Sequence, residues 1–193
     1  MQDKKTAIFE AGRELFLSKR FKEIGVADIT RRAGVSVGTF YNYYGSKEEL
    51  FAKIYFEEND KAKRAVMASI DPEESPVTVA TTFVSRVIDT LNANSVLREW
   101  YDRDVLGELE KTYRAREEKD GCFVYDFFRE LLKKWRAEGK LRLDIDDSDI
   151  FALYDALIYL DTHKTEAGLG RSPQAMQYLV EFMIKGVTGF QKE

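Results

Sequence analysis

Apolar residues recur at helical spacing along most of the chain. In residues 2–19 the apolar positions Ile8, Ala11, Leu15 and Phe16 are separated by charged residues, which predicts an amphipathic helix that packs on one face. The same spacing predicts further helices over residues 76–92, 95–105, 108–138 and 147–165, and from residue 173 onward.

Only three prolines occur, and each stands where a helix can begin or end. In Ser75-Pro76 and Ser172-Pro173 the serine can cap a helix whose first position is proline, where the missing N–H is not needed. In the helix over 108–138 we expect a kink at Gly121 and an end at Gly139. The chain is therefore predicted to be all-α, with an N-terminal three-helix module and about nine helices in total.

The last two helices are unusually apolar. Residues 147–165 are apolar on nearly every side apart from Asp155, so both faces should be covered. In the last helix the apolar residues from Met176 to Phe190 are spaced by 4, 3, 4 and 3, which is an a/d seam for a partner helix. We predict a homodimer in which these helices form a four-helix bundle. The predicted dimer interface comprises Tyr154, Leu157, Met176, Val180, Met183 and Val187.

Residues 21–51, FKEIGVADITRRAGVSVGTFYNYYGSKEELF, are the most informative stretch. A short apolar stripe runs from Val26 to Ala33 and predicts a helix. Gly34 follows as a turn residue that can adopt positive φ, and Ser36 can cap a second short helix. Two short helices joined by a glycine turn are typical of a helix-turn-helix.

The segment VGTFYNYYG has two interpretations. Its β-branched and aromatic residues are also typical of a strand that ends in a turn. As a helix, the segment would bury Phe40 and Tyr44. The next residues favour the helix, because Ser46 and Glu49 form a capping box in which each side chain accepts from the other residue's N–H. From there a helix of about six or seven turns is predicted to run to the first proline.

Charge divides the chain near residue 47. Residues 1–47 hold nine Lys and Arg against five Asp and Glu, a net charge of +4, whereas residues 48–193 hold 21 against 29, a net charge of −8. This asymmetry indicates that the N-terminal part binds a polyanion, although scattered surface charge is the plainer alternative. We expect a boundary between an N-terminal module, residues 1–47, and a helical body, residues 48–193.

The sequence VADITRRAGVSVGTFYNYYGSKEELF resembles the DNA-binding module of the TetR family of bacterial transcriptional regulators, whose pattern there is I-A-x-x-A-G-V-S-x-G-x-x-Y-x-Y-F-x-S-K-E-x-L. Three residues depart from the family's usual choices: Thr30 replaces alanine, Gly25 replaces a capping threonine and Tyr44 replaces phenylalanine. The resemblance implies a helix-turn-helix DNA-binding domain over residues 1–47 and a helical ligand-binding and dimerisation domain over residues 48–193.

In such modules the second short helix lies in the major groove, and residues at helix starts contact phosphates. The residues expected to face base edges are Val37, Thr39 and Asn42. The residues expected to reach phosphates are Tyr41, Tyr43 and Lys47. Gly38 has no Cβ and would let the backbone approach DNA, whereas Ser36 is expected to act chiefly as the helix cap. Arg31 and Arg32 either contact phosphates or stay solvated.

The body contains many aromatic residues that either fill the core or line a pocket. They are Phe83, Trp100, Tyr101, Tyr113, Phe123, Phe127 and Phe128. We expect them to bind a small lipophilic or aromatic effector, because pockets between bundle helices are typically apolar. The expected partners are therefore double-stranded DNA with a palindromic operator, a small-molecule effector and a second copy of the chain. The protein is expected to act as a ligand-responsive repressor.

Enzymatic signals are missing from the sequence. We find no nucleophile beside a base and no phosphate-binding glycine loop, and expect neither enzyme activity nor a cofactor. His163 and Cys122 lack companions for a metal site, and Cys122 is most simply a core residue. Without an apolar run of about 18 residues or a signal peptide, we expect no membrane contact and a cytoplasmic protein. The alternative function is a helical adaptor whose N-terminal module docks a protein and does not bind DNA.

Overall fold

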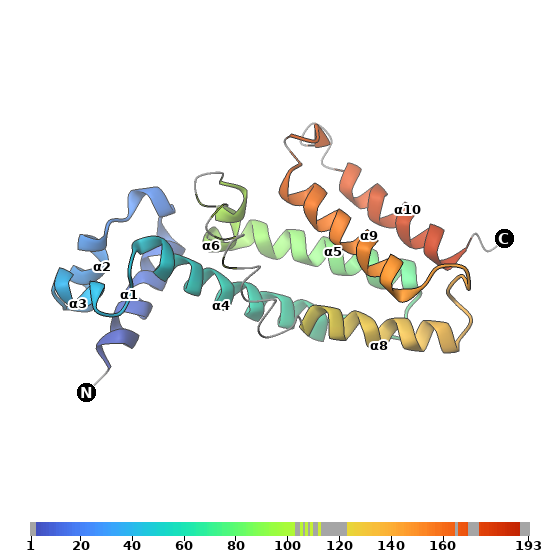
Figure 1. Cartoon of the computed structure of the whole chain (residues 1–193), viewed down its shortest axis with the longest axis horizontal. Coiled ribbons are helices and arrows are strands. Elements are labelled where there is room, and N and C mark those ends of the chain that lie inside the picture. The colour runs from blue at the N-terminus through green and yellow to red at the C-terminus, as the bar shows by residue number, and fades with distance from the viewer. Residues whose placement is uncertain are drawn as a thin grey trace. The chain divides into compact units, whose positions relative to one another are not determined.

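The computed structural model describes residues 3–102, 123–164, 166–169 and 174–189, together with Val105, Gly107, Leu109 and Thr112. Within these residues the chain forms nine α-helices, two short 3₁₀-helices and no strand (Figure 1). The predicted all-α fold is confirmed, and the alternative strand over VGTFYNYYG is wrong. None of the described helices combines the length and the apolar character needed to cross a membrane.

The chain divides into two compact units that share two helices. Unit 1 comprises Met1–Ala62 and Asp89–Gly121, and unit 2 comprises Lys63–Ile88 and Cys122–Glu193. The boundary between them falls inside α4 (Lys47–Ala68) and inside α5 (Pro76–Ala93). Packing does not show which residues bind DNA, so the functional boundary at residue 47 stays a prediction.

Unit 1 combines the N-terminal helices with a short helical segment from the middle of the chain. Its elements are α1 (Lys4–Ser18), the 3₁₀-helix η1 (Phe21–Glu23), α2 (Val26–Ala33), α3 (Val37–Tyr41), the first part of α4, the end of α5, α6 (Ser95–Arg98) and the 3₁₀-helix η2 (Glu99–Tyr101). The single helix predicted over 95–105 is therefore interrupted: α6 covers its first turn, and Glu99–Tyr101 continue as a 3₁₀-helix.

Local side-chain chemistry sets the turn between α2 and α3. Gly34 ends α2 with φ 67°, a left-handed conformation that glycine adopts without steric cost. The Val35 N–H then donates to the Thr30 carbonyl at 3.0 Å. Ser36 begins α3, and its Oγ accepts from the Thr39 N–H at 3.2 Å. The predicted helix-turn-helix and its serine cap are both confirmed.

The N-terminus of α4 differs from the predicted capping box in one bond. The Glu49 N–H donates to Ser46 Oγ at 3.1 Å, as expected. The Glu49 carboxylate, however, accepts from the N–H of Gly45 at 2.8 Å. The reciprocal bond to Ser46 was therefore predicted wrongly, because the carboxylate reaches one residue farther back along the turn.

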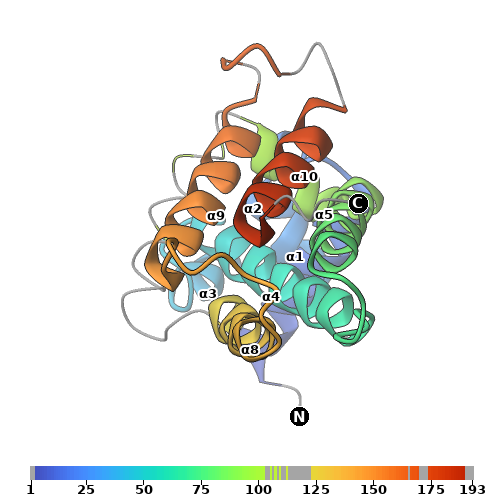
Figure 2. The same ribbon diagram turned by 90° about the vertical axis from the view of Figure 1, so that its right-hand side faces the viewer.

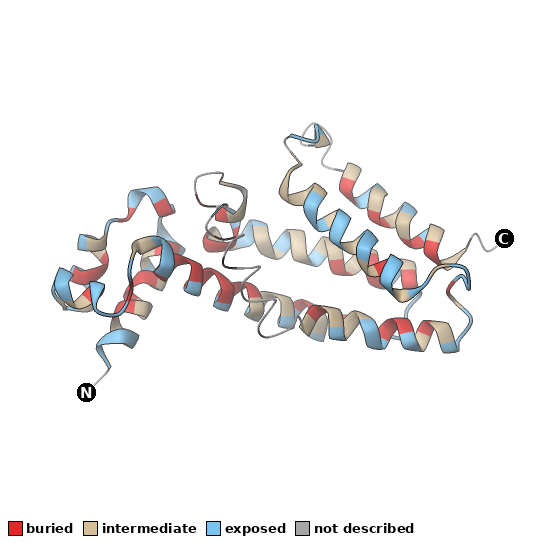
Figure 3. Cartoon of the chain, viewed as in Figure 1, coloured by how far each residue is buried: buried red, intermediate tan, exposed pale blue. Residues whose placement is uncertain are grey.

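Aromatic rings and a close helix crossing form the core of unit 1. The ring of Phe51 from α4 lies 4.9 Å, centroid to centroid, from both Phe16 and Phe21. At Gly12 of α1, an added Cβ would lie only 2.9 Å from Leu50 Cδ2. The absence of a side chain at Gly12 therefore lets α1 pack directly on α4, whose buried residues appear red in Figure 3.

Polar side chains attach α6 and η2 to the N-terminal helices. The Ser95 hydroxyl donates to the Leu17 carbonyl at 2.7 Å, in the last turn of α1. The buried carboxylate of Glu99 accepts from the Phe21 N–H at 3.1 Å. These two bonds satisfy backbone groups that the helix end and the 3₁₀ turn leave unpaired.

A buried carboxylate links three more elements of unit 1. Glu58 of α4 accepts from Arg13 Nε of α1 at 2.7 Å and from Asn94 Nδ2 at 3.0 Å. Asn94 also caps α6, because its Oδ1 accepts from the Val96 N–H at 2.9 Å. The guanidinium of Arg13 compensates the buried charge, and the same pairing raises the pKa of Arg13 above its ordinary value.

Unit 2 is built from the end of α4, most of α5, α8 (Phe123–Ala137), α9 (Asp147–Thr162) and α10 (Ala175–Thr188). Figure 2 shows α9 and α10 side by side. Gly139, with φ 68°, ends α8 as predicted. The expected kink at Gly121, the start at Pro173 and the seam residue Phe190 lie outside the described residues.

The apolar seam of α10 faces the inside of its own chain. Met176, Val180 and Val187 are buried, Val180 with only 3% of its surface exposed. Val180 packs in one cluster with Ala80 of α5, and Leu157 and Met183 pack against the same cluster. Much of this seam is therefore covered within one chain, because the spacing identifies a buried face but not the element that covers it. The dimer interface expected there stays a prediction.

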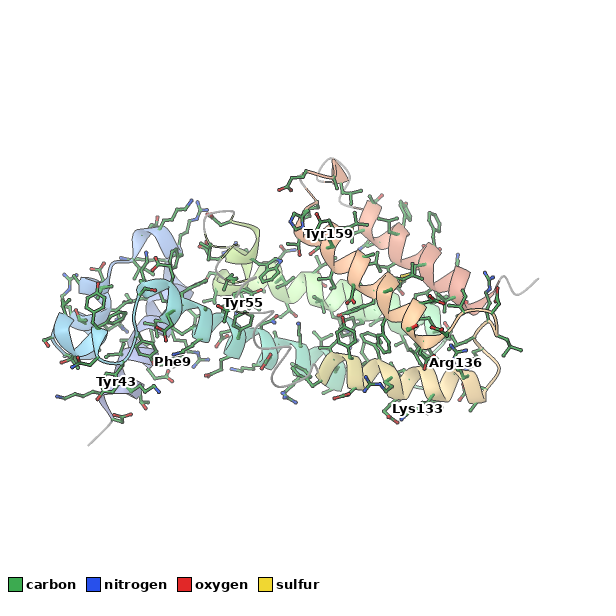
Figure 4. All side chains as sticks on the ribbon, viewed as in Figure 1. Phe9, Tyr43, Tyr55, Lys133, Arg136 and Tyr159 are labelled. Atoms are coloured by element: carbon green, nitrogen blue, oxygen red, sulfur yellow. The ribbon has the colours of Figure 1, made fainter. Side chains whose placement is uncertain are left out.

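A different face of α9 and α10 is open to solvent. Phe182 is 64% exposed and Tyr159, which projects from α9 in Figure 4, is 63% exposed. The large apolar side chains exposed on these two helices are Leu153, Ile158, Tyr159, Tyr178 and Phe182. We call them the outer face. The expectation that both sides of α9 are covered is thus not met within one chain.

Candidate functional site

The side chains of α3 divide into an inner and an outer set. Phe40 and Tyr44 are buried, as predicted, and their ring centroids lie 5.9 Å apart. Tyr41 is 54% exposed, and Val37 and Tyr43 are also exposed (Figure 4 labels Tyr43). The residues predicted to contact DNA at α3 therefore include three large side chains that the chain itself does not cover.

Gly38 has no role in the chain that requires glycine. A Cβ at this position would meet only Ser36 Oγ, at 3.9 Å, an ordinary van der Waals distance. Its φ does not lie in the left-handed range, unlike that of Gly34. Neither steric contacts nor backbone conformation within the described residues requires a glycine at position 38. A molecule that approaches α3 closely from outside the chain would require one.

Some polar side chains of α3 already form hydrogen bonds within the helix. The hydroxyls of Ser36 and Thr39 share a hydrogen bond of 2.9 Å, and Thr39 is half-buried. Asn42 is the C-cap residue of α3 and is exposed. Asn42 is thus the more accessible of the two side chains predicted to form polar contacts with bases, and both assignments stay predictions.

Lys47 has a structural role that the sequence did not reveal. Its Nζ donates to the carbonyls of Phe21 at 3.1 Å and Ile24 at 2.9 Å, and it lies 3.8 Å from the centroid of the Phe21 ring. An ammonium group has three N–H donors, so one is left for a phosphate. Lys47 therefore anchors η1 to α4, and its contact with DNA stays a prediction.

The basic residues of α2 are held in ion pairs. Arg31 pairs with Asp28 of the same helix, and Arg32 Nε lies 2.5 Å from Glu14 of α1. The Gly25 N–H donates to the Asp28 carboxylate at 3.0 Å, which is the main reason that the pKa of Asp28 is lowered, with Arg31 contributing less. Gly25 thus begins α2 without a hydroxyl that could reach a phosphate.

Unit 2 encloses a cavity of about 60 Å³ between α5, α8, α9 and α10. None of its lining residues is charged. The lining consists of Pro76, Ala80, Phe83, Val84, Phe128, Leu132, Trp135, Leu141, Ile150, Phe151, Tyr154, Leu157, Val180, Met183, Ile184, Val187 and Thr188. Five of the six residues predicted for the dimer interface line this cavity, and the sixth, Met176, is buried.

Two of the aromatic residues predicted to bind an effector line this cavity. Phe83 and Phe128 meet edge to face, with centroids 4.9 Å apart. Phe127 packs against Phe128 at 5.4 Å, and Phe123 lies under the guanidinium of Arg64 at 4.1 Å, but neither belongs to the lining.

The other aromatic predictions fall elsewhere. Trp100 belongs to unit 1, where its ring stacks on Tyr55 at 5.7 Å and packs against the core. Trp100 therefore does not line the cavity of unit 2, and its role in ligand binding stays a prediction. The side chain of Tyr101, and Tyr113, lie outside the described residues. Sequence reasoning missed Trp135, although it follows Phe128 and Leu132 at helical spacing.

Metal ligation has no support among the described residues, which contain no group of three or more His, Cys, Asp or Glu suited to a metal ion. His163 stacks on Tyr159 at 4.2 Å, and its Nδ1 lies 3.1 Å from the carbonyl of the same residue. Cys122 lies outside the described part of the chain.

Comparison with known proteins agrees with the N-terminal geometry. Residues 8–54 match the sequence model of the bacterial regulatory proteins, tetR family. The HTH-type transcriptional repressor AcnR of Corynebacterium jeikeium is 23% identical over 150 residues, which are 76% of this chain and 72% of the relative.

Solved structures share the fold. The fatty acid degradation regulator FadR from Bacillus halodurans superposes with a TM-score of 0.60 at 17% identity, covering 100% of this chain and 98% of that one. RolR in complex with resorcinol gives a TM-score of 0.66 at 16% identity, covering 95% and 87%. The matched module, the helix order and the related repressor agree in supporting a TetR-family regulator, with the family model matching the N-terminal module and the solved structures matching the fold.

Proposed function

We propose that the protein is a transcriptional repressor that binds a palindromic operator as a homodimer and leaves it when a lipophilic or aromatic molecule binds in unit 2. The observation that carries the DNA-binding part is the exposed side of α3, with Gly38 at its centre. A glycine that the chain does not need is explained when the backbone of α3 approaches a DNA strand closely.

The outer face supports the homodimer. Tyr178 and Phe182 stack on each other at 6.1 Å and are both half or more exposed. Monomeric soluble proteins rarely expose large apolar patches, so a patch of this kind marks an interaction surface. A two-fold dimer would place two copies of α3 on two half-sites, so that the operator would be palindromic.

The cavity supports a small-molecule effector. It lies between helices and is lined by apolar side chains, which is the common form of a ligand pocket in a helical bundle. RolR, which shares the fold, was solved with resorcinol, a small aromatic compound. An effector bound here and DNA bound at α3 would weaken each other by the same factor, because linkage is reciprocal.

Neither the fold nor the family favours an enzyme, and we propose that the protein carries out no catalysis. Its site of action would be the cytoplasm, where bacterial DNA lies. The adaptor alternative predicts an N-terminal module that binds a protein and ignores DNA.

The test is to select duplex fragments from random DNA with the full chain and to measure affinity for the selected fragment at rising salt. A repressor selects an inverted repeat and loses affinity steeply with salt, because it displaces counterions from several phosphates. An adaptor would select nothing above background, and that outcome would refute the proposal. A selected direct repeat or single half-site would refute the two-fold dimer on DNA.

A further inference from the structure

Two carboxylates are buried among the described residues of unit 1, and only one of them is paired with a cation. Glu58 and Glu99 each expose only 7% of their surface. Glu58 lies 2.7 Å from the guanidinium Nε of Arg13. The partner of Glu99 is a neutral group, the Phe21 N–H, which donates to Oε1 at 3.1 Å. Glu99 forms no ion pair with any residue in the described part of the chain.

The second oxygen of the Glu99 carboxylate is free to bind another group. Within the described residues only Oε1 has a hydrogen-bond partner, and Oε2 is not a fully buried atom. Glu99 lines a cleft of about 380 Å³ whose other lining residues, Arg20, Ser95, Arg98 and Asp102, also belong to unit 1. Buried charges are normally paired, so an unpaired carboxylate oxygen at a cleft indicates a ligand that brings a cation.

The other acid of this cleft already has cations of its own. The Asp102 carboxylate is 14% exposed and lies 3.2 Å from Lys22 Nζ and 3.7 Å from Arg20 Nη2. A cationic group that entered the cleft would have to compete with these two side chains for Asp102. At Glu99 it would meet no competing cation, so Glu99 is the preferred partner.

A guanidinium at the same cleft lacks an anion. Arg98 is exposed, and its side chain forms no hydrogen bond or ion pair with the residues that the structure describes. Arg98 and Glu99 are adjacent in sequence, and adjacent residues of a helix do not face each other. The planar guanidinium matches a carboxylate with two parallel hydrogen bonds. The cleft therefore offers a site for a cation at Glu99 and a site for a carboxylate at Arg98.

Hydrogen bonds to the N-terminal helices hold the inner part of the cleft in place. The Ser95 hydroxyl donates to the Leu17 carbonyl, and the Glu99 carboxylate is held by the Phe21 N–H. A ligand that binds Glu99 would therefore order only the exposed side chain of Arg98, which keeps the entropic cost of binding low.

We propose that this cleft binds a free α-amino acid, whose ammonium group donates to Glu99 Oε2 and whose carboxylate accepts from the Arg98 guanidinium. The lining carries two basic and two acidic side chains, so a ligand with one charge of each sign leaves the balance unchanged. A simple amine would leave Arg98 unpaired, and a simple carboxylic acid would place a second negative charge beside Glu99. This site lies in unit 1 and does not depend on the repressor function proposed above.

The first test measures binding of each of the twenty standard L-amino acids to the full chain by calorimetry, without DNA. The amino acid that binds most tightly is then compared with its amide, which lacks the carboxylate, and with its N-acetyl derivative, which lacks the ammonium group. Each derivative should bind at least about tenfold more weakly, because one charge-assisted contact is lost. If none of the twenty binds, or if the amide binds as tightly as the free amino acid, the proposal is overturned.

Two variants assign the two ends of the ligand. Glu99→Gln keeps an oxygen that can accept from the Phe21 N–H but removes the charge. It should weaken the amino acid and its amide by about tenfold or more and leave the N-acetyl derivative unchanged. Arg98→Gln should weaken the free amino acid by about tenfold and leave the amide unchanged.

Glu57→Gln is the matched control, since it removes one carboxylate from an exposed position on α4 in unit 1 and should leave all three affinities unchanged. Urea unfolding checks that each variant is folded. If Glu99→Gln does not fold, the derivatives on the native chain and the Arg98→Gln variant still decide the question. Native affinity for the amino acid in Arg98→Gln would refute the carboxylate site, and native affinity in a folded Glu99→Gln would refute the ammonium site.

Discussion

Two surfaces of the protein expose large side chains, and they differ in what lies between those side chains. At α3, Val37 and Tyr41 are interspersed with Gly38, Thr39 and the exposed amide of Asn42. On the outer face of α9 and α10, most of the exposed residues are aliphatic or aromatic, and neighbours such as Tyr178 and Phe182 stack on each other.

Exposure alone therefore does not define the partner of a surface. Apolar groups separated by donors, acceptors and a bare backbone suit a duplex, which offers phosphates and base edges. The apolar side chains of the outer face have nothing to offer phosphates, but they would be buried by the same side chains of a second chain.

The largest effect is expected at the outer face. Phe182→Glu should weaken dimerisation by about 2–4 kcal/mol, because a central aromatic contact is lost and a charge is buried. Sedimentation equilibrium measures the change. Lys133→Glu on α8, which changes charge at another exposed position, is the control and should leave the dimer intact. A Phe182→Glu protein that dimerises normally would show that another surface joins the chains.

Gly38→Ala should weaken binding to the selected operator by about 10- to 100-fold, because a Cβ would hold the backbone of α3 away from the DNA. The protein itself should be as stable as before or slightly more so, since alanine favours a helix over glycine by about 0.5–1 kcal/mol. Affinity is measured by fluorescence anisotropy and stability by urea unfolding.

Gly12→Ala is the matched control for this glycine. Here the added Cβ would lie 2.9 Å from Leu50 Cδ2, so the substitution should cost about 1–3 kcal/mol of stability. The folded fraction should bind the operator normally. If Gly38→Ala also lowered stability and left operator affinity unchanged, the glycine at position 38 would be structural and the contrast between the two surfaces would fail.

Smaller changes separate contacts to phosphates from contacts to bases. Tyr41→Phe should weaken binding by about 1 kcal/mol on every DNA sequence, since only a hydroxyl is lost. Asn42→Ala should instead reduce discrimination between the operator and single-base variants, by about 1–3 kcal/mol at one position. Equal losses on specific and random DNA in both variants would place neither residue at a base edge.

The smallest expected effect concerns acid stability at the start of α4. A hydrogen bond from Lys53 and a second from the Gly45 N–H lower the pKa of Glu49. The ionised form therefore stabilises the fold above the ordinary glutamate pKa, and this contribution disappears as pH falls through the lowered value. Glu49→Gln should reduce stability by less than about 0.5 kcal/mol at pH 7 and make its decline in acid shallower, as measured by urea unfolding at several pH values. An unchanged pH dependence would contradict this assignment.

Local interactions made the N-terminal module predictable. Gly34, Ser36 and Ser46 act within a few residues of themselves, so their roles can be deduced from spacing alone. The Glu49 carboxylate was placed one residue too far along, since it accepts from Gly45 and not from Ser46. Lys47 escaped the same reasoning, because its carbonyl acceptors lie 23 and 26 residues away in the chain. Because a lysine side chain is flexible and has three donors, the residues around it in sequence do not predict its acceptors.

The cavity of unit 2 could not be predicted from local sequence patterns. Its walls come from four helices, with Phe83, Trp135, Ile150 and Val180 far apart in sequence. Periodicity correctly marked the apolar face of each helix but assigned the α10 seam to a second chain. Which buried face meets which is decided by packing of whole helices, and hydrophobic spacing carries no information about that choice.

The bonds from residues 94–99 to the N-terminal helices have a consequence for synthesis on the ribosome. The first 62 residues emerge long before Ser95 and Glu99, yet the Leu17 carbonyl and the Phe21 N–H find their partners only in those later residues. Until then the buried carboxylate of Glu58 also lacks the Asn94 amide. The nascent DNA-binding module therefore completes its polar contacts only when about one hundred residues have left the exit tunnel, and a fragment that stops at residue 47 would never complete them.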